Sequence, residues 1–165
     1  MVELNPNLLR WGTSKKTKPI RAKPLSALIV DKSVTAKFVL STLEGNQEIK
    51  EGSVVCIGPA NDAWQQLPNK LFGQYTVTGL DRDGWMECAP KPEAVVDCAP
   101  ITELIIGSEK EFFIYALWGK PVGDGRFTQD GIVGDYVCRN QTDHADVWIV
   151  ARKVFENTRV YMPPI

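Results

Sequence analysis

The stretch Gly52-Ser53-Val54-Val55-Cys56 returns in the second half of the chain as Gly134-Asp135-Tyr136-Val137-Cys138. Each is a short apolar run introduced by a glycine, which is typical of a buried β-strand that follows a turn. Three further similarities occur in the same order along the chain: residues 24–30 with 100–106, 62–64 with 146–148, and 70–72 with 153–155. Four landmarks in one order predict that the chain contains the same β module twice.

The sequence between these landmarks favours β structure. Runs at 25–30, 36–40, 53–57 and 75–78 are rich in β-branched and aromatic residues, and Gly, Asn and charged residues separate them. Pro68 begins a single helical turn that Gly73 ends. We therefore expect a mainly β protein: two tandem small modules of β-barrel or β-roll type, each with about one helical turn. Each module is too small to bury enough surface alone, so we expect pseudo-symmetric packing.

This reading divides the chain into four parts. Residues 24–79 form the first β module, 80–99 a Pro-rich linker hairpin, and 100–165 the second β module, preceded by a basic extended arm at 1–23. The arm holds six cations and one acid, whereas the rest of the chain holds 13 cations and 19 acids. Either the arm is a solvated terminus, or it docks on an acidic neighbour or on nucleic acid. The acidic body argues against duplex DNA as the main partner.

Two features that occur only once in the chain, the basic arm and a loop of the second copy, are the candidate partner-binding sites. The second copy is about six residues longer, most naturally at 119–125, and added loops often carry contacts. The residues predicted to bind a partner lie in the arm and in this loop: Arg10, Trp11, Lys15, Lys16, Lys18, Arg21, Asp124 and Arg126.

No residue pattern predicts catalysis or a cofactor. His144, the only histidine, lies among turn formers, where we expect an exposed side chain rather than a base or metal ligand. Asp62 and Asp146 could share a metal or an acid–base task, but an Asp in a hairpin turn more often binds its own backbone. Trp64 and Trp148 are expected to fill the core of each copy.

The four cysteines contain no closely spaced pair that would indicate a zinc site. Cys56 and Cys138 occupy equivalent apolar runs, and we expect free, buried thiols there. Cys88 and Cys98 share a Cys-Ala-Pro context and are expected in one small hairpin, with a metal pair as the alternative. No phosphate-binding glycine motif is present.

Composition restricts the cellular setting. No apolar run approaches the roughly 20 residues that span a bilayer, and the first residues lack the apolar core of a signal peptide. We expect a protein of the virion or of the host-cell cytoplasm, neither secreted by a signal peptide nor bound to a membrane.

Residues 42–45 (Thr-Leu-Glu-Gly), 52–55, Trp64 and Phe72 follow one another in an order that resembles a small β module of phage and bacterial hypothetical proteins. The second copy matches its later part through residues 134–137 and 155–158. Ser53 departs from the acid of that pattern, and the second copy has no Thr-Leu-Glu-Gly. The resemblance implies a phage or bacterial setting and supplies no catalytic residue.

The sequence thus favours a non-enzymatic structural or interaction protein, such as a virion component, that docks on protein partners or on copies of itself. Nucleic acid would be contacted through the arm only. The alternative is a small-molecule or nucleotide-binding protein, possibly an enzyme, with its site between the modules. A deep pocket with convergent polar groups such as Asp62, Asp146 or Arg126 would favour the alternative, and a flat seam would reject it.

Overall fold

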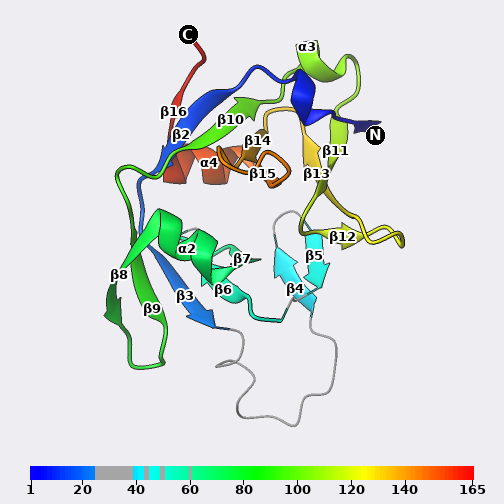
Figure 1. Cartoon of the computed structure of the whole chain (residues 1–165). Helices are drawn as coiled ribbons and strands as arrows, with labels where there is room; N and C mark the ends of the chain where they lie inside the picture. The colour runs from blue at the N-terminus through cyan, green and yellow to red at the C-terminus, as the bar shows by residue number, and fades with distance from the viewer. Residues whose placement is uncertain (25–38, 43–44, 49–50, 60) are drawn as a thin grey trace.

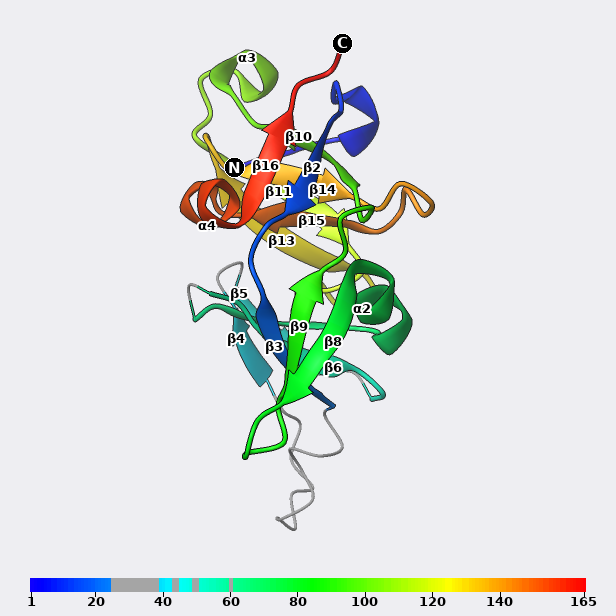
Figure 2. The ribbon, with the colours of Figure 1, turned by 90° about the vertical axis from the view of Figure 1, so that its left-hand side faces the viewer.

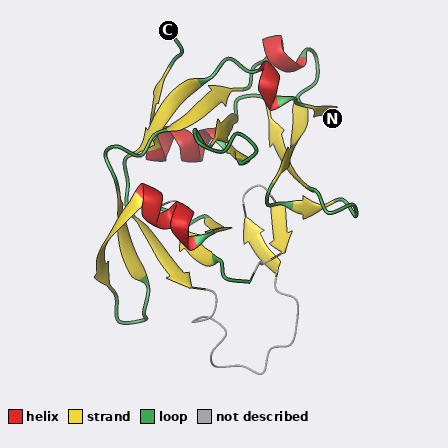
Figure 3. Cartoon of the chain, in the orientation of Figure 1, coloured by secondary structure: helices red, strands yellow, loops and turns green. Residues whose placement is uncertain are grey.

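The computed structural model describes residues 1–24, 39–42, 45–48, 51–59 and 61–165. The predicted strand at 25–30 and most of the one at 36–40 lie outside these ranges. Within them the protein is mainly β, as expected, and strands dominate the ribbon in Figure 3.

Two five-stranded antiparallel sheets make up most of the fold (Figure 1). The first sheet has the order β7 (Ala63–Gln66), β6 (Val54–Ile57), β3 (Ile20–Pro24), β9 (Met86–Pro90) and β8 (Tyr75–Leu80). The second has the order β15 (Val147–Val150), β14 (Tyr136–Arg139), β10 (Val96–Pro100), β2 (Gly12–Lys16) and β16 (Arg159–Met162). Neither order closes on itself, so the predicted barrels are not confirmed.

The two sheets share the register of their strands. In the first sheet, Cys56 lies opposite Ala22 on one side and Trp64 on the other. In the second sheet, Cys138 lies opposite Cys98 and Trp148 in the same way. The strands that carry the repeated landmarks therefore occupy the same places in the two sheets.

Residues 1–23 form strands of both sheets instead of the extended arm that their charge predicted. The chain passes from β2 in the second sheet to β3 in the first, and from β9 in the first sheet to β10 in the second (Figure 2). Ser14, Ile20 and Ala22 are buried, because alternate residues of a strand face the sheet's packed side. The buried residues of β2, Gly12 and Ser14, are small and not hydrophobic, so the sequence pattern did not indicate that this strand is buried.

The segment predicted as a linker hairpin, residues 80–99, is also part of the sheets. β9 pairs with β8 across the turn that precedes it, and β10 pairs with β2 and β14. Cys88 therefore lies in the first sheet and Cys98 in the second, so the expected Cys88–Cys98 hairpin is wrong. β9, which carries Cys88, is hydrogen-bonded to β3 and β8, whereas β10, which carries Cys98, is hydrogen-bonded to β2 and β14.

Each sheet carries a helix between two of its strands: α2 (Pro68–Gln74) lies between β7 and β8, and α4 (Arg152–Thr158) lies between β15 and β16. Both are longer than the expected single turn, and α2 runs through Gly73 rather than ending there. Leu71 and Phe155 fill the equivalent core positions and are fully buried, whereas Phe72 is 43% exposed. The match of Phe72 with Phe155 read from the sequence is therefore one residue out of register.

A four-stranded sheet covers the second half, with the order β1 (Val2–Glu3), β11 (Glu111–Ala116), β13 (Phe127–Ile132) and β12 (Lys120–Pro121). Phe112 and Ile114 on β11 are fully buried and pack with Val137 and Ile149 of the second sheet. β4 (Val39–Thr42) and β5 (Gly45–Glu48) pair with each other as a two-stranded antiparallel sheet. Two further short helices lie in the described ranges: η1 (Pro6–Leu8) and α3 (Glu103–Ile106).

Candidate functional site

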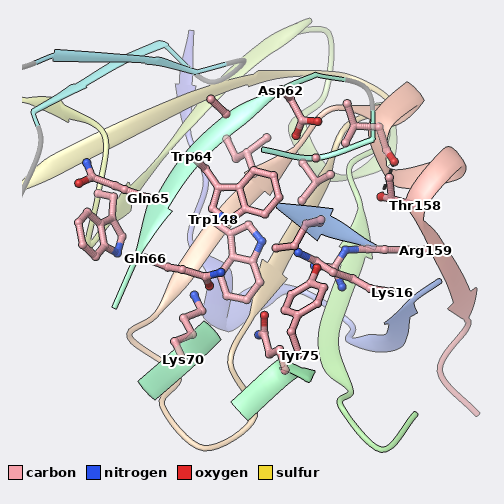
Figure 4. A pocket seen from close by; sticks show the side chains of 18 of the residues that line it. Lys16, Asp62, Trp64, Gln65, Gln66, Lys70, Tyr75, Trp148, Thr158 and Arg159 are labelled. Atoms are coloured by element: carbon pink, nitrogen blue, oxygen red, sulfur yellow. Dashed lines mark hydrogen bonds between the residues drawn. The ribbon is translucent and has the colours of Figure 1, made fainter. Parts of the chain in front are cut away.

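A cavity of about 120 Å³ lies between the two halves of the molecule. Its walls come from α2 and α4 up to the last residue of each helix, from β7 and β15, from the last residue of β2 and from the first residues of β8 and β16 (Figure 4). Trp64 and Trp148, which hold equivalent positions, both line it and are half-buried. Each ring also packs against the buried core residues of its own sheet, as expected, so these two side chains both cover the core and border the cavity.

Two cations stand side by side in its wall. Lys16 on β2 and Arg159 on β16 lie directly opposite each other in an antiparallel pair, where Cβ atoms are separated by about 4.5–5.5 Å. Arg159 is only 8% exposed, and its Nη1 donates a hydrogen bond to Ser14 Oγ at 3.3 Å. Like charges placed directly opposite destabilise a sheet. In the part of the chain that the structure describes, no carboxylate forms an ion pair with either cation.

The Lys16 amine lies among aromatic rings. Its Nζ is 4.7 Å from the ring centre of Trp64 and 4.9 Å from that of Tyr75. Burial, followed by the nearby charge of Arg159, lowers the pKa of this amine from 10.5 to about 7; Lys70 acts in the same direction. Near neutral pH the amine is therefore divided between its charged and neutral forms.

A third cation is neutralised across the cavity. The Nζ of Lys70 on α2 lies 2.8 Å from Asp146 Oδ2 and 3.9 Å from the centre of the Trp148 ring. Asp146 is 6% exposed. The turn before β15 is instead held by Asp143, whose Oδ1 accepts from the amide of Ala145. The expectation that Asp146 binds its own backbone is thus wrong, because its carboxylate joins the two halves.

Two polar atoms in the cavity region have no hydrogen-bond partner among the described residues: Asp62 Oδ1 and Tyr75 Oη. Both side chains border the cavity, and the fully buried Tyr75 is at the first position of β8. Burial raises the pKa of the Tyr75 phenol, so it keeps its proton. An unsatisfied buried polar atom is costly, and a bound polar molecule would remove that cost.

The cysteines are free and buried, as expected. Burial raises the pKa of the Cys56 thiol to about 11 and that of Cys138 to about 12. Gln66 Nε2 donates to Cys56 Sγ at 3.3 Å. Such protonated thiols are poor nucleophiles. Over the described ranges, no group of three or more His, Cys, Asp or Glu side chains could hold a metal ion.

The residues predicted to bind a partner are spread over the molecule. Of these, Lys16 and Lys18 line the cavity, whereas Lys15 points to the opposite, exposed side of β2. Arg10 donates to the backbone oxygen of Ile165, and Arg21 lies 5.7 Å from the Trp85 ring.

The rest of that predicted set pairs within the chain. The Trp11 ring is covered by Arg139 at 4.3 Å. Asp124 and Arg126 form an exposed ion pair of 2.6 Å in the loop that follows β12, and Arg126 also covers Tyr115. His144 is exposed in a turn, as expected. The structure thus does not bring the predicted partner-binding residues together into one surface.

Sequence reasoning missed Arg159, Tyr75 and Lys70. Tyr75 and Arg159 hold the same position after α2 and α4, so the predicted repeat could have pointed to them. The pair Lys15-Lys16 also held a signal, since adjacent residues of a strand face opposite sides and one of the two must point inward.

Comparison with known proteins found no matching protein family, no matching curated protein and no matching solved structure. The resemblance to a phage or bacterial module stays a prediction. Among the described residues, no helix is long and apolar enough to cross a membrane.

Proposed function

We propose that this protein binds a small organic anion, of the carboxylate class, in the cavity between its two sheets. The observation that carries the proposal is the pair of cations, Lys16 and Arg159, which face one cavity without a carboxylate partner among the described residues. Buried cations without counter-charges are unfavourable, and an anionic ligand would supply the missing charge. A planar carboxylate also suits the fixed fork of a guanidinium.

The size of the cavity and the residues of its walls restrict which ligands would fit. A cavity of about 120 Å³ is slightly smaller than the engineered cavity of about 150 Å³ that admits benzene. The rings of Trp64, Trp148 and Tyr75 supply apolar faces. We infer a compact acid with a short apolar body, of roughly four to seven non-hydrogen atoms.

An internal duplication would explain where this site lies. The shared strand register of the two sheets supports a duplicated module, and the place of β2, from the start of the chain, in the second sheet supports tight packing of the copies. A pocket between two related halves is a common place for a ligand. In this proposal the copies diverged mainly at the cavity wall.

The alternative of a structural or virion component drew its main support from a free basic arm. Those residues instead form β2 and β3. The pocket, which is lined by Asp62 and Asp146 but not by Arg126, supports a ligand-binding protein over an assembly component. Assembly stays an untested prediction, and no arrangement of the described residues favours it over ligand binding.

Titration of the tryptophan fluorescence with propanoate tests the proposal, because Trp64 and Trp148 line the cavity. We expect saturable binding with a dissociation constant of about 1 mM or tighter. Propanol, which has the same carbon chain and no charge, is expected to bind at least about tenfold more weakly.

Arg159→Met should abolish propanoate binding, whereas the matched variant Arg152→Met, at an exposed position on α4, should bind as the wild type does. If Arg159→Met fails to fold, the affinities of the wild type for propanoate and for propanol still test whether the cavity binds an anion. Equal affinity for the two molecules, or no saturable response to propanoate or inorganic phosphate, would reject the proposal. Binding of phosphate alone would keep an anion site and reject the carboxylate class.

A further inference from the structure

We infer that Lys16 is a nucleophilic amine that forms a covalent imine with a small α-keto or aldehyde acid bound in this cavity. The inference rests on the proposed anion site and adds a reaction to it. It assigns different tasks to the two cations: Arg159 holds the carboxylate of the ligand, and Lys16 attacks the neighbouring carbonyl carbon.

The geometry provides the two contacts that such a molecule needs. Lys16 and Arg159 are direct cross-strand partners, so both side chains leave the same face of the second sheet. In Figure 4 their nitrogen atoms lie close together near the Tyr75 ring. An α-keto acid carries its carboxylate and its carbonyl on adjacent carbons, which matches two cationic side chains side by side.

The surroundings of Lys16 favour a reactive amine. A lysine becomes a nucleophile when an apolar site or another cation disfavours its charged form. Both conditions hold here, because rings of Trp64 and Tyr75 border the amine and Arg159 stands opposite it. No ion pair with a carboxylate of the described residues holds it in the charged form.

The reaction balances without a redox partner. The lone pair of the neutral amine attacks the carbonyl carbon and forms a C–N bond. The carbonyl oxygen then leaves as water, carrying both protons of the amine, and a C=N bond remains. The Tyr75 hydroxyl, which keeps its proton and has no partner among the described residues, can donate a hydrogen bond to the carbonyl oxygen in the cavity.

Trapping with cyanoborohydride tests the inference on the intact wild-type chain. Glyoxylate and sodium cyanoborohydride at pH 7 should add one reduced adduct, and peptide mapping should place it on Lys16. We expect labelling of Lys16 at least about tenfold faster than that of Lys15, the exposed lysine beside it. Lys16→Arg should lose this label, and Lys15→Arg should keep it.

Two controls separate the inference from the proposed function. Excess propanoate should protect Lys16 from trapping, because the two acids compete for Arg159. Raising the pH from 6 to 8 should weaken propanoate binding, because binding needs the charged amine of Lys16. The same change should accelerate trapping, because imine formation needs the neutral amine. The charged side chains that act on the amine are Arg159 and Lys70, and the raised pKa values of Cys56 and Cys138 keep these two thiols protonated over this range.

Label spread evenly over surface lysines, with propanoate binding intact, would overturn the imine and leave the anion site standing. If neither selective labelling of Lys16 nor binding of propanoate is observed, both the imine and the anion site are overturned. Trapping that excess propanoate does not slow would also overturn the inference, since the reaction would then occur outside the anion site.

Discussion

Replacing Lys16 by methionine should stabilise the protein without ligand. The change removes the amine from the cavity and keeps an unbranched side chain of similar length. The fall of the Lys16 pKa from 10.5 to about 7 corresponds to a cost of roughly 5 kcal/mol for the charged form in the folded state. The rings of Trp64 and Tyr75 offset about 1 kcal/mol each. We therefore expect Lys16→Met to raise the free energy of unfolding by about 3 kcal/mol at pH 6.

The effect should depend on pH in a defined direction. The pKa of Lys16 is lower in the folded chain than in the unfolded chain, so above pH 7 the unfolded chain binds the extra proton. Wild-type stability should therefore rise from pH 7 upward, by at most about 1.4 kcal/mol per pH unit. Above about pH 9, Cys56 and Cys138 stay protonated only when folded, which lowers stability. The effect of Lys16 on stability can thus be observed between pH 7 and pH 9.

Urea denaturation followed by tryptophan fluorescence and by far-ultraviolet circular dichroism, at four pH values from 6 to 9, would measure both effects. Lys15→Met is the matched control, because Lys15 is exposed on the other side of the same strand. It should leave both the stability and its pH dependence almost unchanged. A Lys16→Met variant less stable than the wild type at pH 6 would refute the reasoning, as would a wild type with constant stability between pH 7 and 9.

Further substitutions test the fold and the wall of the cavity. Leu71→Ala should cost about 2–5 kcal/mol, because Leu71 is fully buried, whereas Phe72→Ala at the exposed neighbouring position should cost under about 1 kcal/mol. Thermal or urea unfolding would separate the two, and equal losses would contradict the helix register. Asp146→Asn leaves Lys70 without its counter-charge and should cost about 3 kcal/mol, a loss that Lys70→Met in the same chain should largely relieve.

The mainly β class and the strands around the repeated glycines could be predicted, because their signal is local. Val54, Val55 and Cys56 form an apolar run between a turn and a polar segment, and their strand follows from that pattern alone. The positions of Cys56 and Cys138 in the two sheets agree with the match read from the sequence. Their ladder partners could not be predicted, since pairing across a sheet depends on distant parts of the chain.

The candidate site could be predicted only in part, and the reason lies in β2. Its residues Gly12, Ser14 and Lys16 face the packed side, yet none is apolar, so the strand resembles a polar arm. The count of charges therefore assigned Lys15 and Lys16 to one partner-binding arm, although neighbouring residues of a strand point to opposite sides of the sheet. Asp62 and Asp146 were rightly singled out as a recurring pair, but the Lys70 partner of Asp146 lies on a helix of the other half.

The register of the two sheets also fixes how many anions the cavity can hold. Lys16 lies opposite Arg159 in the second sheet, and at the corresponding place in the first sheet Pro90 lies opposite Tyr75. The cation pair therefore exists in the second sheet only, and of the corresponding two residues in the first sheet Tyr75 alone lines the cavity. A two-fold related pair of acids would leave one carboxylate without such a cation pair, since Lys18, the other lysine of the wall without an ion pair among the described residues, is exposed to solvent. One ligand per chain is the stoichiometry that this wall can neutralise, and titration calorimetry with propanoate should give a ratio near one.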